Sequence, residues 1–144
     1  MKAKEFLMQI GKLDKIIENK EYEKQRWKDI ATSVTNQIGS EKVQSSGGKD
    51  KIANAVAKYI DIEHEIDADI DRMIDIKRDV MEIIETLDVE EYDVLHKRYI
   101  QGLDFYEIAL LLDKSYSWVT SKHGTALKHL QQKIDERECN ETQV

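Results

Sequence analysis

The chain has 144 residues, a formal net charge of −7 and no proline, and 35% of its residues are charged. A chain this acidic does not coat nucleic acid by bulk attraction, and its single cysteine, Cys139, excludes an intrachain disulfide. The lack of proline permits long helices. Because no long apolar run follows the first basic residues, we expect a cytoplasmic protein that does not enter a membrane.

The first half of the chain carries two apolar series with steps of four and three residues. Such a rhythm predicts helices, since the apolar period of a strand would be two. The first series is Phe6, Ile10, Leu13, Ile17, Lys20, Lys24, Trp27, Ala31, Val34 and Ile38. The second is Ile52, Val56, Tyr59, Glu63, Ile66, Ile70, Met73, Lys77, Val80, Ile84 and Leu87. Between them a segment rich in glycine and serine, residues 39–48, predicts a loop.

Two long helices joined by one short loop predict an antiparallel hairpin, a coiled coil over residues 1–88. If Ile38 faces Ile52, the polar breaks in the two series lie near one another. Lys20 and Lys24, the breaks in the first series, are then expected near Glu63 and Asp67. Residues 1–49 carry a net charge of +3 and residues 50–88 one of −7, which favours the same pairing.

Apolar residues that a single seam leaves uncovered predict a homodimer. They are Leu7, Ile16, Ile30, Ile60, Ile62, Ile74, Ile76 and Met81. One hairpin cannot bury all of them, so we expect hairpins from two chains to form a bundle. The alternative is that the C-terminal part of the chain folds back and covers them within one chain.

After Leu87 the rhythm changes, and capping residues predict three shorter helices. The expected caps are Asp88, Asp104 and either Ser115 or Ser117, and the expected ends are Gly102, Leu112 and about Ile134. We therefore predict an all-α protein with a long helical hairpin, a three-helix module over residues 89–134, and a polar tail over residues 135–144.

The spacing within this module is typical of a helix-turn-helix. Ala109 is a small residue where two helices can cross closely, and Val119, ten residues later, points back inward. Asp113 stands where such motifs often place glycine, but aspartate tolerates unusual turn geometry. Residues 94–133 carry a net charge of +3, which suits a surface that meets double-stranded DNA.

The last helix of the module supplies the candidate DNA contacts. Residues near its N-terminus are expected to face base edges in the major groove; they are Tyr116, Ser117, Thr120 and Ser121. Basic residues are expected to meet phosphates; they are Lys122, His123 and Lys128. Gly124 lies inside this helix, where glycine costs about 1 kcal/mol against alanine and permits close approach to a phosphate or another helix.

Residues 94–128 resemble region four of sigma-seventy-type factors. The resemblance rests on Val94–Tyr99, Gly102-Leu103, Glu107-Ile108-Ala109 and Ala126-Leu127-Lys128. Over nearly its full length the chain is similar to short phage and prophage proteins, the RinA/ArpU-type late-transcription regulators. The further matching features are Lys2-Ala3-Lys4-Glu5, Val43-Gln44-Ser45-Ser46-Gly47 and Asn54-Ala55-Val56-Ala57-Lys58. In one departure, Thr125 stands where the family pattern often has arginine.

The resemblance implies regulation of phage late genes by DNA binding in the bacterial host cell, with contact to RNA polymerase as a further expectation. Two other functions would use the same features. One is recognition of a DNA-packaging site by a small-terminase-like protein. The other is a pure protein–protein interaction module that grips RNA polymerase or another protein.

The sequence shows no pattern typical of an enzyme, a metal site or a cofactor site. The acidic run that begins at Asp61 lacks the glycine and the glutamate of a calcium loop. His64-Glu65 lacks the second histidine of a zinc-protease helix, because Ala68 occupies its place. We expect a protein without catalytic residues, cofactor or metal.

Overall fold

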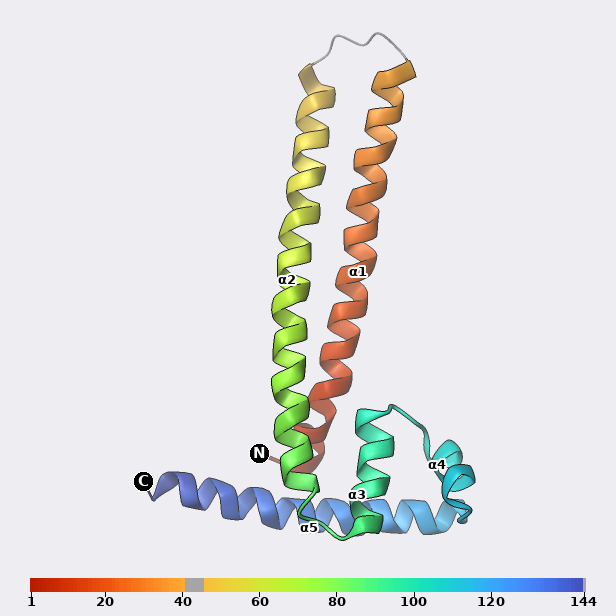
Figure 1. Cartoon of the computed structure of the whole chain (residues 1–144), viewed down its shortest axis with the longest axis vertical. Helices are drawn as coiled ribbons and strands as arrows, with labels where there is room; N and C mark the ends of the chain where they lie inside the picture. Colours follow the sequence, from red (N-terminus) through yellow and green to blue (C-terminus); the bar gives the residue numbers. More distant parts are fainter. Residues whose placement is uncertain (41–45, 144) are drawn as a thin grey trace. The chain divides into compact units, whose positions relative to one another are not determined.

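The computed structural model describes residues 1–40 and 46–143, and every regular element in these ranges is a helix (Figure 1). The prediction of an all-α protein is confirmed. The elements are α1 (Ala3–Ser40), α2 (Ser46–Ile84), α3 (Val89–Leu95), the π-helical turn η1 (His96–Ile100), α4 (Phe105–Leu112) and α5 (Tyr116–Thr142). The chain divides into two compact units, Leu13–Arg72 and the combination of Met1–Lys12 with Met73–Val144.

In the unit Leu13–Arg72, α1 and α2 lie side by side in opposite directions. Lys20 Nζ lies 2.7 Å from Asp69 Oδ2 and 3.8 Å from Glu65 Oε2. Further along α1, Lys24 Nζ lies 5.7 Å from the centre of the Tyr59 ring. The lysines therefore pair with residues other than the predicted Glu63 and Asp67. The expected contact between Ile38 and Ile52 lies outside the described residues, because nothing is described of the Ile38 side chain.

On the buried face of α2, every second member of the predicted apolar series is replaced by the residue just before it. Ala55 and Asp69 are buried, whereas Val56 and Ile70 are 43% and 42% exposed. A carboxylate occupies the buried position because Lys20 donates a hydrogen bond to it. The seam of α2 therefore advances by three and then four residues. It follows Ile52, Ala55, Tyr59, Ile62, Ile66, Asp69 and Met73.

The unit that combines Met1–Lys12 with Met73–Val144 has a core to which all five α-helices contribute. Its fully buried side chains include Leu7, Ile10, Val80, Ile84, Val94, Leu95, Ile108, Val119 and Leu130. Leu7 was one of the apolar residues expected to need a second chain, and it is covered within one chain instead. Ile62 and Ile76 are half-buried, while Ile60 and Ile74 remain exposed.

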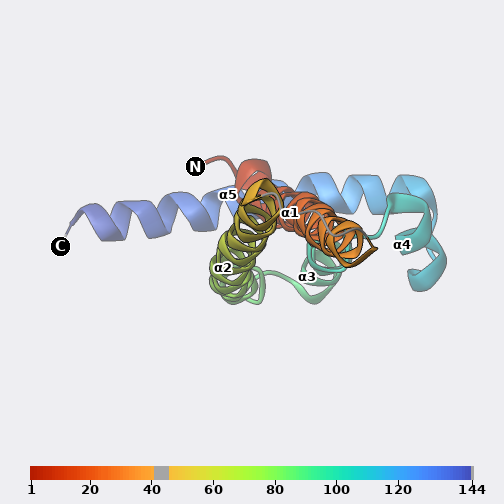
Figure 2. The ribbon, with the colours of Figure 1, turned by 90° about the horizontal axis from the view of Figure 1, so that it is seen from above.

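Helix α5 is longer than predicted, because it continues past Ile134 to Thr142. Figure 2 shows it as one unbroken helix with the first turns of α1 beside it. Gln131 Oε1 accepts a hydrogen bond of 2.7 Å from the backbone N–H of Ala3. Arg137 Nη2 lies 2.5 Å from Asp79 Oδ1 in α2. The expected polar tail is therefore helical over residues 135–142, and contacts with α1 and α2 hold this half of α5 in place.

Candidate nucleic-acid interface

Asp104 caps the start of helix α4, as the sequence predicts. The backbone N–H of Glu107 donates to Asp104 Oδ1 at 2.8 Å, and the backbone N–H of Asp104 donates to Glu107 Oε2 at 3.3 Å. This reciprocal pair satisfies two N–H groups that the helix start would leave free. Asp88 occupies the equivalent position before α3, but its side chain does not make the predicted capping hydrogen bond.

A short turn, Asp113-Lys114-Ser115, joins α4 to α5. Asp113 adopts a left-handed conformation with φ of 53°, which ends α4 in the way that glycine usually does. Ser115 Oγ accepts a hydrogen bond of 3.0 Å from the backbone N–H of Trp118 and so caps α5. The unusual turn geometry expected at Asp113 is confirmed, and of the two candidate caps, Ser115 and Ser117, it is Ser115 that caps α5.

A small hydrophobic core sets the rotation of α5 about its own axis. Ala109 of α4 and Val119 of α5 belong to one buried cluster with Val94 and Ile108. The half-buried side chains that pack against this cluster are Leu103, Phe105, Leu112 and Trp118. Because Val119 is completely buried, the opposite side of α5 must face outward.

That outward side carries Ser117, Ser121, Gly124 and Lys128, which follow one another at steps of four, three and four residues. All four are exposed. A Cβ added to Gly124 would meet no atom within 4 Å, so packing within the chain does not require glycine at this position. We call these four residues the α5 outer face. It presents hydroxyl groups, a bare backbone and one ammonium group.

Tyr116 and Thr120 flank the α5 outer face. The Tyr116 ring stacks on the ring of Tyr106 in α4, with a centroid distance of 4.5 Å and an interplanar angle of 29°. Thr120 is half-buried, and its hydroxyl group donates to the backbone carbonyl of Ser117 at 3.1 Å. Both side chains are thus partly engaged within the chain, unlike those of Ser117 and Ser121.

Lys122 lies on the side of α5 that faces α3. Its Nζ lies 3.3 Å from Glu90 Oε2 and 5.4 Å from the centre of the Trp118 ring. Lys114 Nζ approaches the same ring at 5.1 Å. The Lys122 side chain is half-buried and its charge is already paired, so it is less available to a phosphate than the exposed Lys128.

His123 also turns inward and away from the α5 outer face. Its Nε2 lies 2.7 Å from the hydroxyl oxygen of Tyr99, and its ring packs edge-on against Phe105 at 5.0 Å. Burial lowers the pKa of His123 below its ordinary value of 6.5, and the positive charges of Arg98 and Lys4 lower it further. An uncharged, half-buried imidazole is poorly suited to the phosphate contact expected from the sequence.

A buried carboxylate, which the sequence did not reveal, joins α3 to α5. Glu91 is buried in α3, and its Oε1 lies 2.7 Å from His129 Nδ1 in α5. The other carboxylate oxygen, Oε2, is buried without a hydrogen-bond partner. This contact and the Glu90–Lys122 ion pair both fix α3 against the inner side of α5.

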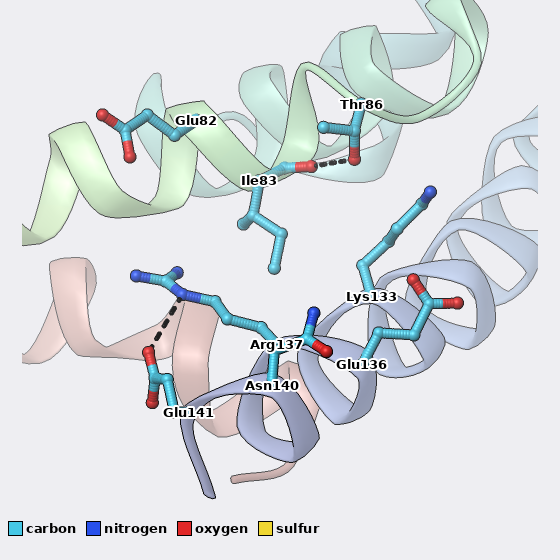
Figure 3. A pocket seen from close by; sticks show the side chains of 8 residues that line it. All are labelled: Glu82, Ile83, Thr86, Lys133, Glu136, Arg137, Asn140 and Glu141. Carbon is cyan, nitrogen blue, oxygen red and sulfur yellow. Dashed lines mark hydrogen bonds and ion pairs between the residues drawn. The ribbon is translucent and has the colours of Figure 1, made fainter. Parts of the chain in front are cut away.

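A groove of about 490 Å³ lies between the end of α2 and the C-terminal half of α5 (Figure 3). Its lining is Glu82, Ile83, Thr86, Lys133, Glu136, Arg137, Asn140 and Glu141. Figure 3 shows the Ile83 side chain pointing into the groove and Arg137 directed toward Glu141, whose Oε1 lies 3.7 Å from Arg137 Nε. Three carboxylates outnumber two cations here, so this groove is less suited to DNA than the α5 outer face.

Within the described ranges, no helix is long and apolar enough to cross a membrane. Among the same residues, no cluster of three or more histidine, cysteine or acidic side chains could hold a metal ion. Comparisons of the chain with protein-family models, with curated proteins and with solved structures find no match.

Proposed function

We propose that the chain is a sequence-specific DNA-binding regulator of phage or prophage transcription, in which α4 and α5 form a helix-turn-helix and α5 enters the major groove. The observation that carries the proposal is the α5 outer face, which lies opposite the fully buried Val119 and begins directly after a tight turn. In a helix-turn-helix the N-terminal residues of the second helix contact base edges. Ser117 and Ser121 occupy that position in α5.

The chemistry of the α5 outer face fits a DNA groove. Serine hydroxyl groups donate to and accept from several base edges, and the bare backbone at Gly124 permits close approach of the sugar–phosphate chain. Lys128 supplies a charge for a phosphate. The proposed contacts are therefore Ser117, Ser121, Gly124 and Lys128, with Tyr116 and Thr120 at the edge. We leave Lys122 and His123 out because both are engaged with neighbouring residues.

The proposal includes a homodimer that recognises two half-sites and recruits RNA polymerase at a phage late promoter. Two-fold symmetric helix-turn-helix proteins place their recognition helices in successive major grooves. The support for polymerase contact is the resemblance of residues 94–128 to region four of sigma-seventy-type factors.

The test is selection of preferred sites from a pool of random-sequence duplexes, followed by affinity measurements with the full-length protein. The double variant Ser117→Ala/Ser121→Ala should lose about 1–3 kcal/mol per good base contact on the selected duplex and little on random duplexes. Ser33→Ala, at an exposed position of α1, is the matched control and should change neither affinity.

Three results would count against this proposal. Equal binding of both duplexes by the double variant would remove the α5 outer face from base recognition. No DNA affinity at low salt would favour a pure protein–protein interaction module. Selected sites that map to a packaging locus and not to promoters would favour a small-terminase-like function.

A further inference from the structure

The first turn of α1 is attached to α5 beside the α5 outer face (Figure 2). Gln131 Oε1 accepts a hydrogen bond of 2.7 Å from the backbone N–H of Ala3, and its Nε2 donates to the backbone carbonyl of Met1 at 3.1 Å. Gln131 lies three residues after Lys128 and seven after Gly124, and residues at these spacings share one side of a helix. The start of α1 therefore lies along one edge of the α5 outer face.

The residue that follows Ala3 is Lys4, and its side chain is directed from Gln131 toward the N-terminal half of α5. Burial lowers the pKa of His123, and the charge of Lys4 lowers it further, so the ammonium group lies close to that ring. His123 precedes Gln131 by eight residues, a distance of about 12 Å along a helix. The stretch of α5 beside Lys4 therefore holds Gly124, a member of the α5 outer face.

The charges around Lys4 suit an anionic partner. The Lys4 side chain is exposed, and none of the described carboxylates forms an ion pair with it. Within α5 no acid precedes Asp135, whose Oδ1 accepts a hydrogen bond of 3.0 Å from Gln131. Glu5, the acid in the first turn of α1, is turned about 100° around the helix from Lys4. Lys4 is thus a free cation beside the half of α5 that carries no acid.

We propose that Lys4 binds a phosphate of the DNA strand that borders the major groove occupied by α5, so that α1 forms part of the DNA interface. The inference rests on the proposed function, because it requires α5 to lie in the groove. The groove is about 12 Å wide and a helix with its side chains about 10–12 Å across, so a sugar–phosphate chain passes along each side of α5. One of these sides holds Lys4. A phosphate contact there fixes the position and orientation of the protein on the duplex.

Replacement of Lys4 in the full-length protein tests the contact on the selected duplex and on a random duplex across a salt series. Lys4→Ala should lower the affinity for both duplexes by the same factor, and it should reduce the slope of log affinity against log salt concentration by about 0.9. Lys4→Arg keeps the charge and should bind like the parent. Lys12→Ala, at an exposed position about two turns further along α1, is the matched control and should also bind like the parent.

Neutral methylphosphonates, placed one at a time along the edges of the selected site, identify the phosphate. At one position the substitution should weaken binding by the parent and by Lys12→Ala, but not by Lys4→Ala, which has already lost the contact. The inference is wrong if Lys4→Ala keeps the affinity and slope of the parent, or if every methylphosphonate weakens both proteins equally. Neither result touches the proposed function when Ser117→Ala/Ser121→Ala still loses affinity for the selected duplex, whereas a parent without DNA affinity overturns both.

Discussion

The ammonium group of Lys20 lies 2.7 Å from the Oδ2 of Asp69, a side chain that is buried between α1 and α2. Arg72 contacts the other oxygen of the same carboxylate at 2.9 Å. A buried carboxylate is stable only when its hydrogen bonds are satisfied, so this contact selects one register of the two helices at a cost in stability.

The buried pair should therefore be strongly coupled. Lys20→Met alone should lower the free energy of unfolding by about 1–3 kcal/mol, because Asp69 loses a charged hydrogen-bond partner. The double variant Lys20→Met/Asp69→Leu should be close to the parent or more stable, because apolar contact replaces the desolvated pair. Urea denaturation of the parent, both single variants and the double variant checks this, and additive losses would contradict the coupling.

The seam of α2 shows where sequence reasoning fails. Starting at Ile52, a first step of four gives Val56 and a first step of three gives Ala55, and both are apolar. The series that takes Val56 continues to Ile70 and leaves Asp69 out. The sequence alone favours that series, because a carboxylate buried in a seam without a charged partner is unfavourable, and only the fold shows that Lys20 is its partner. By contrast, a serine cap at Ser115 or Ser117 was predictable, since a cap depends only on residues within one helical turn.

Lys128 and Lys122 should respond differently to replacement by alanine. Lys128 is exposed on the α5 outer face, so Lys128→Ala should reduce the slope of log affinity against log salt concentration by about one, as expected for one lost phosphate contact. Lys122 is already paired with Glu90, so Lys122→Ala should change that slope less and lower stability by under about 1 kcal/mol. Binding to a random duplex across a salt series separates them, and equal slopes in both variants would contradict this assignment.

Gly124→Ala should separate stability from binding. Alanine favours the helix by about 1 kcal/mol, and its Cβ meets no atom of the chain, so the variant should melt at a higher temperature. The added methyl group should hinder close approach of DNA and weaken binding. Gly11→Ala in α1 is the matched control, because its Cβ is also free of contacts; it should stabilise the protein without weakening binding. Unchanged affinity in Gly124→Ala would show that DNA does not approach this position.

The inward position of His123 predicts a pH dependence of stability. Because its pKa in the folded chain lies below the ordinary value of 6.5, the unfolded chain binds the proton first as the pH falls. The free energy of unfolding should thus be highest above pH 6.5 and decline below it. Urea denaturation over this range should show less decline in His123→Gln, while His64→Gln at an exposed position of α2 should follow the parent. Parallel curves for His123→Gln and the parent would refute the assignment.

The orientation of Lys122 and His123 could have been read from helical spacing. They lie three and four residues after Val119, and residues at these distances share one side of a helix. By the same rule Ser117 and Lys128 lie on the other side, as observed. The pairing of Glu91 with His129 could not have been predicted, because it depends on how α3 docks against α5, and no local pattern encodes that contact.

The hydrogen bond between the backbone N–H of Ala3 and Gln131 joins positions 128 residues apart, and it bears on the order in which the protein folds. Leu13–Arg72 interrupts the other compact unit in sequence and contains a local pair of helices. Local pairs form quickly, whereas contacts between distant positions wait for loop closure. During synthesis α5 emerges after the other four helices, so the unit that carries the α5 outer face can close only once α5 has been made.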